Sequence, residues 1–198
     1  MDLYAGKASM LGRLAPLVEW LVRAGISADA LTLAALPVAA FAAVCLVASP
    51  AVPALLVAIP ILAGLRILLN LLDGAVARRT GRIHPRGELL NELGDRLADI
   101  GFLAPVAVLP GASPTLVLLG VIVGILASYV GITARAAGGE RIYRGILSKP
   151  GRMVLVSVAA IGCLVVGDQA WAWFGPLLLL GTSLTLLERI AIAVRRLP

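Results

Sequence analysis

The stretch "LNLLDGAVARRTGRIHPRGELLNELGDRLAD", residues 69–99, concentrates charge in a chain that is otherwise apolar. Of the 198 residues, 60% are hydrophobic and 14% are charged, and the mean hydropathy is +1.00. A soluble globular domain carries roughly 25% charged residues. The composition therefore excludes a soluble globular domain and indicates an all-α integral membrane protein, in which a polar stretch of this kind needs a physical reason.

Six segments of the chain are long and apolar enough to cross a membrane, since a crossing takes about 20 mostly apolar residues. We predict a single domain in which residues 28–198 form a bundle of six transmembrane helices and residues 1–27 form an N-terminal interfacial arm. A hydropathy scan could skip the third segment, because five charged residues stand in its first half. The predicted spans are 30–48, 52–72, 87–109, 115–136, 153–167 and 171–194.

The charge of the connectors supports the count of six spans. Connectors 49–51, 110–114 and 167–169 contain neither Lys nor Arg. By the positive-inside rule the protein is a multi-pass cell-membrane protein with both termini cytoplasmic, and this pattern alternates only if the third segment crosses. The basic residues collect at the opposite ends of the spans: Lys7, Arg13, Arg23, Arg78, Arg79, Arg82, Arg86, Arg135, Arg141, Arg144, Lys149, Arg152, Arg189, Arg195 and Arg196.

The net charge of +6 does not indicate a nucleic-acid partner, because topology and anionic headgroups account for the excess of basic residues. Connector 135–152 is the longest charged one, with five basic residues and one acid. It suits a phosphate or an anionic headgroup, and it equally suits a loop that only sets topology. Both interpretations stay open.

The N-terminal arm has an apolar side formed by Leu11, Leu14, Val18 and Leu21, which is typical of a helix lying on the inner leaflet. Pro16 leaves a frayed arm as an alternative. Ser27 or Asp29 is the expected cap of the first span.

Two polar faces follow when residues 66–99 are placed on helices. At about 100° per residue, Arg66, Asn70, Asp73 and Ala77 share one face of the second span. A row at every fourth position follows on the third span, and the short loop 79–86 joins the two, so the faces can meet. The row consists of Gly87, Asn91, Asp95 and Asp99.

Carboxylates at membrane depth cost roughly 2.5–3.5 kcal/mol each on insertion scales, unless they face a polar cavity or a cation. Arg66 and Arg96 can supply part of the counter-charge, and a hard divalent cation bound by oxygen ligands can supply the rest. The alternative is an ion-pair network that only holds the two helices together.

Small residues accompany these acids. Gly74 and Ala77 leave room for a ligand against the helix backbone, and Arg78 can bind a phosphate through two hydrogen bonds. Close packing of helices in the membrane would favour the same small residues.

Taken together, Asp73-Gly74, two residues, Ala77-Arg78, eight residues, Gly87 and then Asp95 resemble the signature of the CDP-alcohol phosphotransferases. That signature reads D-x2-D-G-x2-A-R-x8-G-x3-D-x3-D. The likeness extends to six spans and an interfacial helix, and weakly to "SADALT" (27–32), which is similar to the family's P-N-x-L-T.

The resemblance implies the roles of several residues. Asp29, Thr32, Gly74, Ala77, Arg78 and Gly87 would bind the CDP-linked substrate. Asp73, Asp95 and the positions of Asn70 and Asn91 would bind Mg²⁺ or Mn²⁺. Asp95 would also take the proton of the acceptor hydroxyl.

This chain departs from the family at two of its four motif aspartates, where it carries Asn70 and Asn91. An amide oxygen still binds a metal but brings no charge, so either the metal affinity falls or one of two metals is lost. Glu92 and Asp99 stand nearby and could compensate. The lone His84 is interpreted as a solvated or interface residue rather than a ligand.

The implied function is phospholipid biosynthesis. A phosphatidyl group would pass from a CDP-linked lipid such as CDP-diacylglycerol to an alcohol or a phosphorylated alcohol, CMP would leave, and the enzyme would be a homodimer. Two alternatives stay open: a catalytically impaired relative that binds CDP-lipid, and an ion or proton carrier, for which acids in the membrane are also expected.

Overall fold

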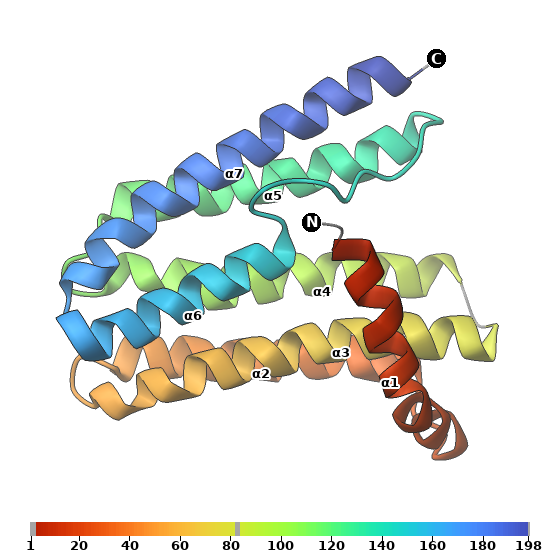
Figure 1. Ribbon diagram of the computed structural model, residues 1–198, viewed down its shortest axis with the longest axis horizontal. Coiled ribbons are helices and arrows are strands. Elements are labelled where there is room, and N and C mark those ends of the chain that lie inside the picture. Colours follow the sequence, from red (N-terminus) through yellow and green to blue (C-terminus); the bar gives the residue numbers. More distant parts are fainter. Residues whose placement is uncertain (1–2, 82–83, 198) are drawn as a thin grey trace.

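The computed structural model describes residues 3–81 and 84–197, with side chains described from residue 12 onward. Every regular element in this part of the chain is helical, which confirms the predicted all-α class (Figure 1). Lys7, Leu11 and Arg82 were part of the charge and periodicity arguments, but their side chains lie outside the described residues. The elements are α1 Leu3–Arg23, α2 Ala28–Ala48, η1 Pro53–Val57, α3 Ala58–Thr80, α4 Pro85–Leu103, η2 Ala104–Val108, α5 Pro114–Ala136, α6 Lys149–Val166 and α7 Gln169–Arg196.

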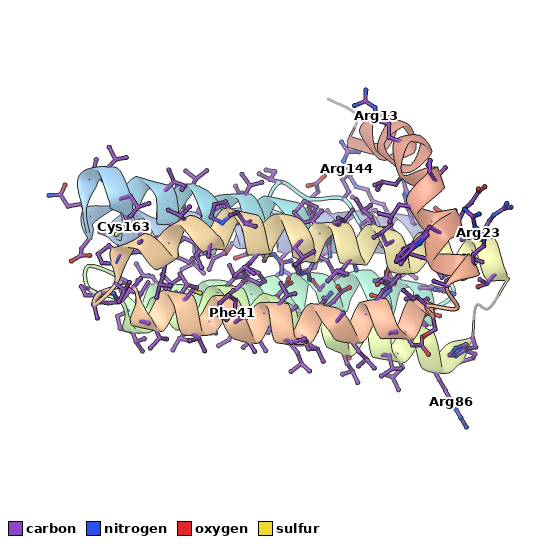
Figure 2. All side chains as sticks on the ribbon, turned by 90° about the horizontal axis from the view of Figure 1, so that it is seen from below. Arg13, Arg23, Phe41, Arg86, Arg144 and Cys163 are labelled. Atoms are coloured by element: carbon purple, nitrogen blue, oxygen red, sulfur yellow. The ribbon has the colours of Figure 1, made fainter. Side chains whose placement is uncertain are left out.

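Five segments of the described chain are long and apolar enough to span a membrane: α2, η1 with α3, α5, α6 and α7. Their outer faces carry exposed large apolar side chains, as expected for contact with lipid. Phe41, for example, points away from the bundle (Figure 2). The protein is therefore a multi-pass membrane protein. The remaining predicted span, 87–109, corresponds to α4, whose composition is too polar for this criterion.

The helix boundaries depend on a few local signals. Ser27 caps α2 by accepting a hydrogen bond from the Ala30 amide at 3.1 Å, so it is the cap rather than Asp29. Gly81 ends α3 in the left-handed region, at φ 67°. His84 caps α4, and its Nδ1 accepts from the Gly87 amide at 2.9 Å. The connector 79–86 is consequently shorter than predicted, and the motif residues up to Arg78 are helical.

The N-terminal arm forms one helix, α1, which continues through Pro16. Val18 and Leu21 are buried against Leu31 of α2 and Leu72 and Val76 of α3. Figure 1 shows α1 lying across the end of α3 rather than alongside it. Of the two alternatives for the arm, an interfacial helix and a frayed segment, the structure has a helix. Its orientation across α3 is the one expected of an interfacial helix.

Glycines set the close approach of α5 and α7. A Cβ atom on Gly120 would lie 2.8 Å from Leu178 Cγ and 3.0 Å from the Leu179 amide nitrogen. A Cβ on Gly175 would lie 3.1 Å from Leu116 Cβ. Since apolar side chains gain nothing from leaving lipid, van der Waals contact at small residues is what holds membrane helices together.

Buried ion pairs connect α3, α4 and α6. Asp99 of α4 is 1% exposed and accepts hydrogen bonds from two guanidinium groups, Arg66 of α3 at 3.0 Å and Arg152 of α6 at 2.7 Å. Arg152 also donates to Ser128 of α5 at 3.3 Å. The two arginines are as buried as the acid. Asp99 is thus the point at which three helices meet.

The glycine packing predicts that Gly120→Val destabilises the protein by about 1–3 kcal/mol, since the added atoms overlap α7. Thermal unfolding in detergent, followed by circular dichroism, measures this. Gly64→Val is the matched control, because a Cβ there meets nothing within 4 Å. Equal melting temperatures for the two variants would contradict the packing argument.

The ion pairs predict that Asp99→Asn lowers the free energy of unfolding by about 3–5 kcal/mol, because two buried guanidinium groups lose their counter-charge. Glu140→Gln removes a charge that is 88% exposed and should change stability little. Unfolding of both variants in a denaturant series makes the comparison. If Asp99→Asn is as stable as Glu140→Gln, the three-helix junction is not a stabilising element.

Candidate active site between α2, α3, α4 and α6

Asp73 is held on α3 by two neighbours. Its side chain is buried, and Thr32 of α2 donates from Oγ1 to Asp73 Oδ2 at 2.9 Å. The amide of Gly74 donates to the other carboxylate oxygen. Both hydrogen bonds fix the orientation of the carboxylate. The motif aspartate is therefore preorganised by the residue that follows it and by a threonine 41 positions earlier.

Asp95 lies opposite on α4 and is surrounded by donors from two other helices. Asn70 donates from Nδ2 to Asp95 Oδ1 at 3.1 Å, and Arg66 Nη2 lies 3.3 Å from the same oxygen. The ammonium of Lys149, at the start of α6, forms an ion pair with Asp95 Oδ2. The predicted meeting of the two polar faces is thus observed.

A small cavity of about 10 Å³ lies between these groups, which is the size that holds one water molecule. Its oxygen donors include the carboxylates of Asp73 and Asp95 and the amide of Asn70, and these are ligands that suit Mg²⁺ or Mn²⁺. Within 3–81 and 84–197, no three His, Cys, Asp or Glu side chains are grouped to hold a metal. The amide is therefore needed for a third protein ligand, and the donor set fits a single ion. The cavity is lined by Thr32, Ala35, Arg66, Asn70, Asp73, Gly94 and Asp95.

The two acids that could compensate for the asparagines are both ion-paired. Glu92 pairs with Arg141, and its second oxygen lies 3.8 Å from Arg96. Asp99 forms ion pairs with Arg66 and Arg152. Neither acid lines the cavity. The ion-pair network proposed as an alternative is present, and it lies beside the cavity rather than in its place.

Lys149 and Arg152 are site residues that sequence reasoning assigned to the basic connector. The structure places both in the first turn of α6, with Arg152 1% exposed. The signal was available, because Ser148 and Pro150 form the Ser-x-Pro pattern of a helix start. Starting the helix there, instead of at residue 153, would have turned these cations toward the bundle.

Arg189 also belongs to the buried basic residues, and it organises the connector. Its guanidinium donates to the carbonyl oxygens of Ala127, Tyr143 and Arg144 at 2.7, 3.0 and 2.8 Å. In Figure 1 this connector returns across the bundle from the end of α5 to the start of α6. Arg189 therefore determines where Lys149 begins its helix.

The small residues of the motif leave space that the Arg78 side chain and residues of α2 occupy. A Cβ on Gly74 would lie 3.2 Å from Arg78 Nη1, so the Arg78 side chain folds over this glycine. A Cβ on Gly87 would lie 3.0 Å from Asp29 Oδ1, and one on Gly94 3.2 Å from Thr32 Cγ2. Asp29 and Thr32 are thus brought against the glycine side of α4.

Six of the proposed site residues do not line the cavity: Asp29, Gly74, Ala77, Arg78, Gly87 and Asn91. Ala77 and Asn91 are half-buried, Arg78 is exposed, and none of the three lines the cavity. His84 lies 3.6 Å from Asp29 Oδ2 and caps α4, in agreement with its interpretation as an interface residue.

No model of a known protein family matches the chain. Individual proteins, however, are similar to it. The chain is 34% identical over 155 residues to the inner membrane protein YnbA of Escherichia coli, which covers 78% of this chain and 77% of that protein. It is 34% identical over 147 residues to an archaetidylinositol phosphate synthase of Aeropyrum pernix, covering 73% and 72% of the two chains.

Solved structures share the fold. The phosphatidylinositol phosphate synthase PgsA1 of Mycobacterium tuberculosis, crystallised with CDP-DAG, matches with a TM-score of 0.74 at 22% identity, over 91% of this chain and 93% of that one. The same enzyme with manganese and citrate matches with a TM-score of 0.74 at 21% identity, over 91% and 88%.

These findings confirm the family that residues 70–95 indicated. The identity to a synthase over more than two thirds of both chains agrees with the arrangement of Asp73, Gly74 and Asp95. The chain therefore belongs to the CDP-alcohol phosphotransferase family, the transferases that move a phosphatidyl group from a CDP-linked lipid to an alcohol in phospholipid biosynthesis.

Proposed function

We propose that this protein transfers a phosphatidyl-type group from a CDP-linked lipid, such as CDP-diacylglycerol, to a phosphorylated alcohol. The observation that carries the proposal is the pairing of Asp73 and Asp95 around an ion-sized cavity beside a buried cluster of basic side chains. The relatives are named as synthases of archaetidylinositol phosphate and phosphatidylinositol phosphate. Both names denote products in which the acceptor part carries its own phosphate.

Asp73, Asp95 and the amide of Asn70, which line the cavity, are the residues that would hold Mg²⁺ or Mn²⁺, whereas Asn91 does not line it. Such an ion, when bound, neutralises the pyrophosphate charge of the donor and stabilises the departing phosphate of CMP. Solved PgsA1 binds manganese, and the donor set around the cavity of this chain suits the same class of ion.

The CDP part of the donor would lie along the glycine side of α3 and α4. Asp29 and Thr32 reach this side from α2, and Arg78 would bind the phosphates from the exposed end of α3. Gly74, Ala77 and Gly87 would leave the backbone open to the ligand. The solved PgsA1 that shares this fold has CDP-DAG bound.

Asp95 would act as the general base. It would take the proton from the acceptor hydroxyl, whose oxygen then forms the new bond to phosphorus while the bond from phosphorus to the CMP oxygen breaks. Arg66 and Lys149 hold the Asp95 carboxylate in place through ion pairs. The positive neighbours also favour an acceptor that brings negative charge.

Arg96 supports a phosphorylated acceptor. Its guanidinium is buried, and none of its three nitrogen atoms makes a hydrogen bond to a described residue. The nearest carboxylate oxygens, on Glu92 and Asp95, are 3.8 Å away. A buried guanidinium that makes no hydrogen bonds is costly. The phosphate of an acceptor would supply them as charge-assisted hydrogen bonds. Arg141 and Lys149 lie on the same carboxylates and would extend this site.

We also propose that α4 is a sixth membrane crossing. Its acids are neutralised by Arg66, Lys149 and Arg152, and such pairing is what allows charged residues at membrane depth. Six crossings would place both termini on the cytoplasmic side, together with Arg23 and Arg86, which lie at one end of the bundle in Figure 2, while Cys163 lies at the other. The domain would be residues 28–198 with the arm 1–27, and the enzyme would act as a homodimer.

The ion-carrier alternative has little support from this geometry. Among the described residues, the buried acids and cations extend from the end where α3 ends and α4 begins to the level of Arg66 and Asp99. No buried charged residue of the described chain lies between that level and the end near Cys163, so no charged route crosses the bundle. The catalytically impaired relative remains the competing function, and turnover decides between the two.

For the transferase function, we expect the purified protein in lipid to release CMP from CDP-diacylglycerol only with Mg²⁺ or Mn²⁺ and a phosphorylated acceptor. Asp95→Asn should lower the rate by about 10²–10⁴-fold, because the base is lost, and Asp73→Asn should abolish metal-dependent release. Asp168→Asn, an exposed aspartate at the far end of the bundle, is the control. Binding of CDP-lipid without CMP release for any acceptor would establish the impaired relative instead.

For the acceptor site, Arg96→Gln should raise the KM for the phosphorylated acceptor about tenfold or more, since a charge-assisted hydrogen bond contributes about 1.5–3 kcal/mol. The KM for CDP-diacylglycerol should change little, and Arg96→Lys should restore part of the acceptor affinity. Arg86→Gln, which removes an exposed arginine, is the control. A loss that falls on both substrates equally would place Arg96 in the packing of α4 rather than in the acceptor site.

A further inference from the structure

The charge around Asp95 is already balanced by the chain itself. Four carboxylates and five basic groups are gathered there, counted over the described residues. Two divalent cations would therefore be repelled more strongly than one, because the cluster already has one basic group more than it has carboxylates. The carboxylates are those of Asp73, Glu92, Asp95 and Asp99, and the basic groups are those of Arg66, Arg96, Arg141, Lys149 and Arg152.

Both oxygens of Asp95 are occupied by groups of the chain. Oδ1 accepts from the Arg66 guanidinium and the Asn70 amide, at 3.3 and 3.1 Å, and Oδ2 is paired with the Lys149 ammonium. A carboxylate that is to bridge two metal ions would need these positions for the ions. The side chains of Arg66 and Lys149 therefore occupy positions next to Asp95 at which metal ions would otherwise supply the positive charge.

Asn70 matches this arrangement better than an aspartate would. Its amide donates a hydrogen bond to Asp95, which an ionised carboxylate cannot do. An aspartate at the same place would put a second negative charge next to Asp95 and would remove this donor. Asn70 and the neighbouring Arg66, one helical turn earlier, thus both lower the negative charge around Asp95 compared with a site that has an aspartate at position 70.

The remaining space has room for one ion. The cavity of about 10 Å³ corresponds to a single water-sized sphere, with Asp73 on one side of it and the occupied Asp95 on the other. Asp73 has no cation within ion-pair distance among the described residues, in contrast to Asp95.

We propose that each active site of this protein binds one divalent cation, and that Arg66 and Lys149 supply from within the chain the positive charge that a second cation would bring. The proposal rests on the transferase function above and specifies its metal requirement. It accounts for Asn70, which lines the cavity and donates to Asp95, as part of a working one-metal site.

Mn²⁺ counted by electron paramagnetic resonance tests the proposal directly. The full-length protein in nanodiscs of zwitterionic lipid is titrated with Mn²⁺ alone, with empty nanodiscs as the blank. We expect one Mn²⁺ per chain, without the spin coupling of two neighbouring ions, and none in Asp73→Asn. Two ions per chain, or none in the unaltered protein, would overturn the proposal.

A variant pair separates the role of Lys149 from that of the asparagines. The first variant restores both aspartates and removes the lysine, Asn70→Asp/Asn91→Asp/Lys149→Met, and it should bind two spin-coupled Mn²⁺ ions. Asn70→Asp/Asn91→Asp/Arg196→Met, which removes an exposed arginine instead, should still bind one. Two ions in the second variant, or one ion in a folded first variant, would show that Lys149 does not take the place of a metal. If the first variant does not fold, the count in the unaltered protein still decides.

CMP release measured on the same nanodiscs distinguishes this inference from the function on which it rests. One Mn²⁺ with metal-dependent release supports both. Two Mn²⁺ with release overturn the one-metal site and leave the transferase in place. One Mn²⁺ without release for any acceptor supports the site and overturns the transferase function.

Discussion

The structure depends on the neutralisation of acidic side chains inside a membrane bundle. Asp99 lies between the guanidinium groups of Arg66 and Arg152, and all three side chains are almost fully buried. A buried pair of this kind contributes little net stability compared with an apolar contact of the same size. Its effect is on arrangement, because an unpaired charge in this position would be far more costly. The pairing therefore fixes how α3, α4 and α6 are placed relative to one another.

The same arrangement produces the candidate active site. Arg66 bridges Asp99 and Asp95, so the residue that holds the helices together also positions the proposed base. Lys149 approaches Asp95 from α6, whose start is set by the connector that Arg189 binds. Thr32 and Gly74 orient Asp73 on the other side of the cavity. Positioning of catalytic groups by buried, hydrogen-bonded neighbours is the usual requirement for a preorganised site.

The departures from the family motif follow from this electrostatic environment. In a site with four aspartates, the charge must come from outside as metal ions, whereas here part of it is built into α3 and α6. Replacing an aspartate by Asn70 removes a negative charge and adds a donor to Asp95. Asn70 and the basic residues around Asp95 thus both reduce the need for metal-bound positive charge, and a transferase with a smaller metal requirement is the result that we infer.

Much of this protein follows from its sequence alone. Apolar segments of about 20 residues can only be helices in a membrane, because every backbone group must form its hydrogen bond within the segment. The fixed spacing from Asp73 to Asp95 likewise needs only helical periodicity to bring two polar faces together, and it identified the family. The tertiary structure decided what each charged residue contacts. Lys149 and Arg152 follow Asp99 by about 50 positions, and no local pattern states which acid a distant cation will meet. Glu92 and Asp99 looked like spare metal ligands because sequence spacing places them beside the motif. Only the packing of α6 and of the connector against α4 shows that basic side chains occupy them, since ion pairing depends on distances of a few ångströms between segments that the sequence does not relate.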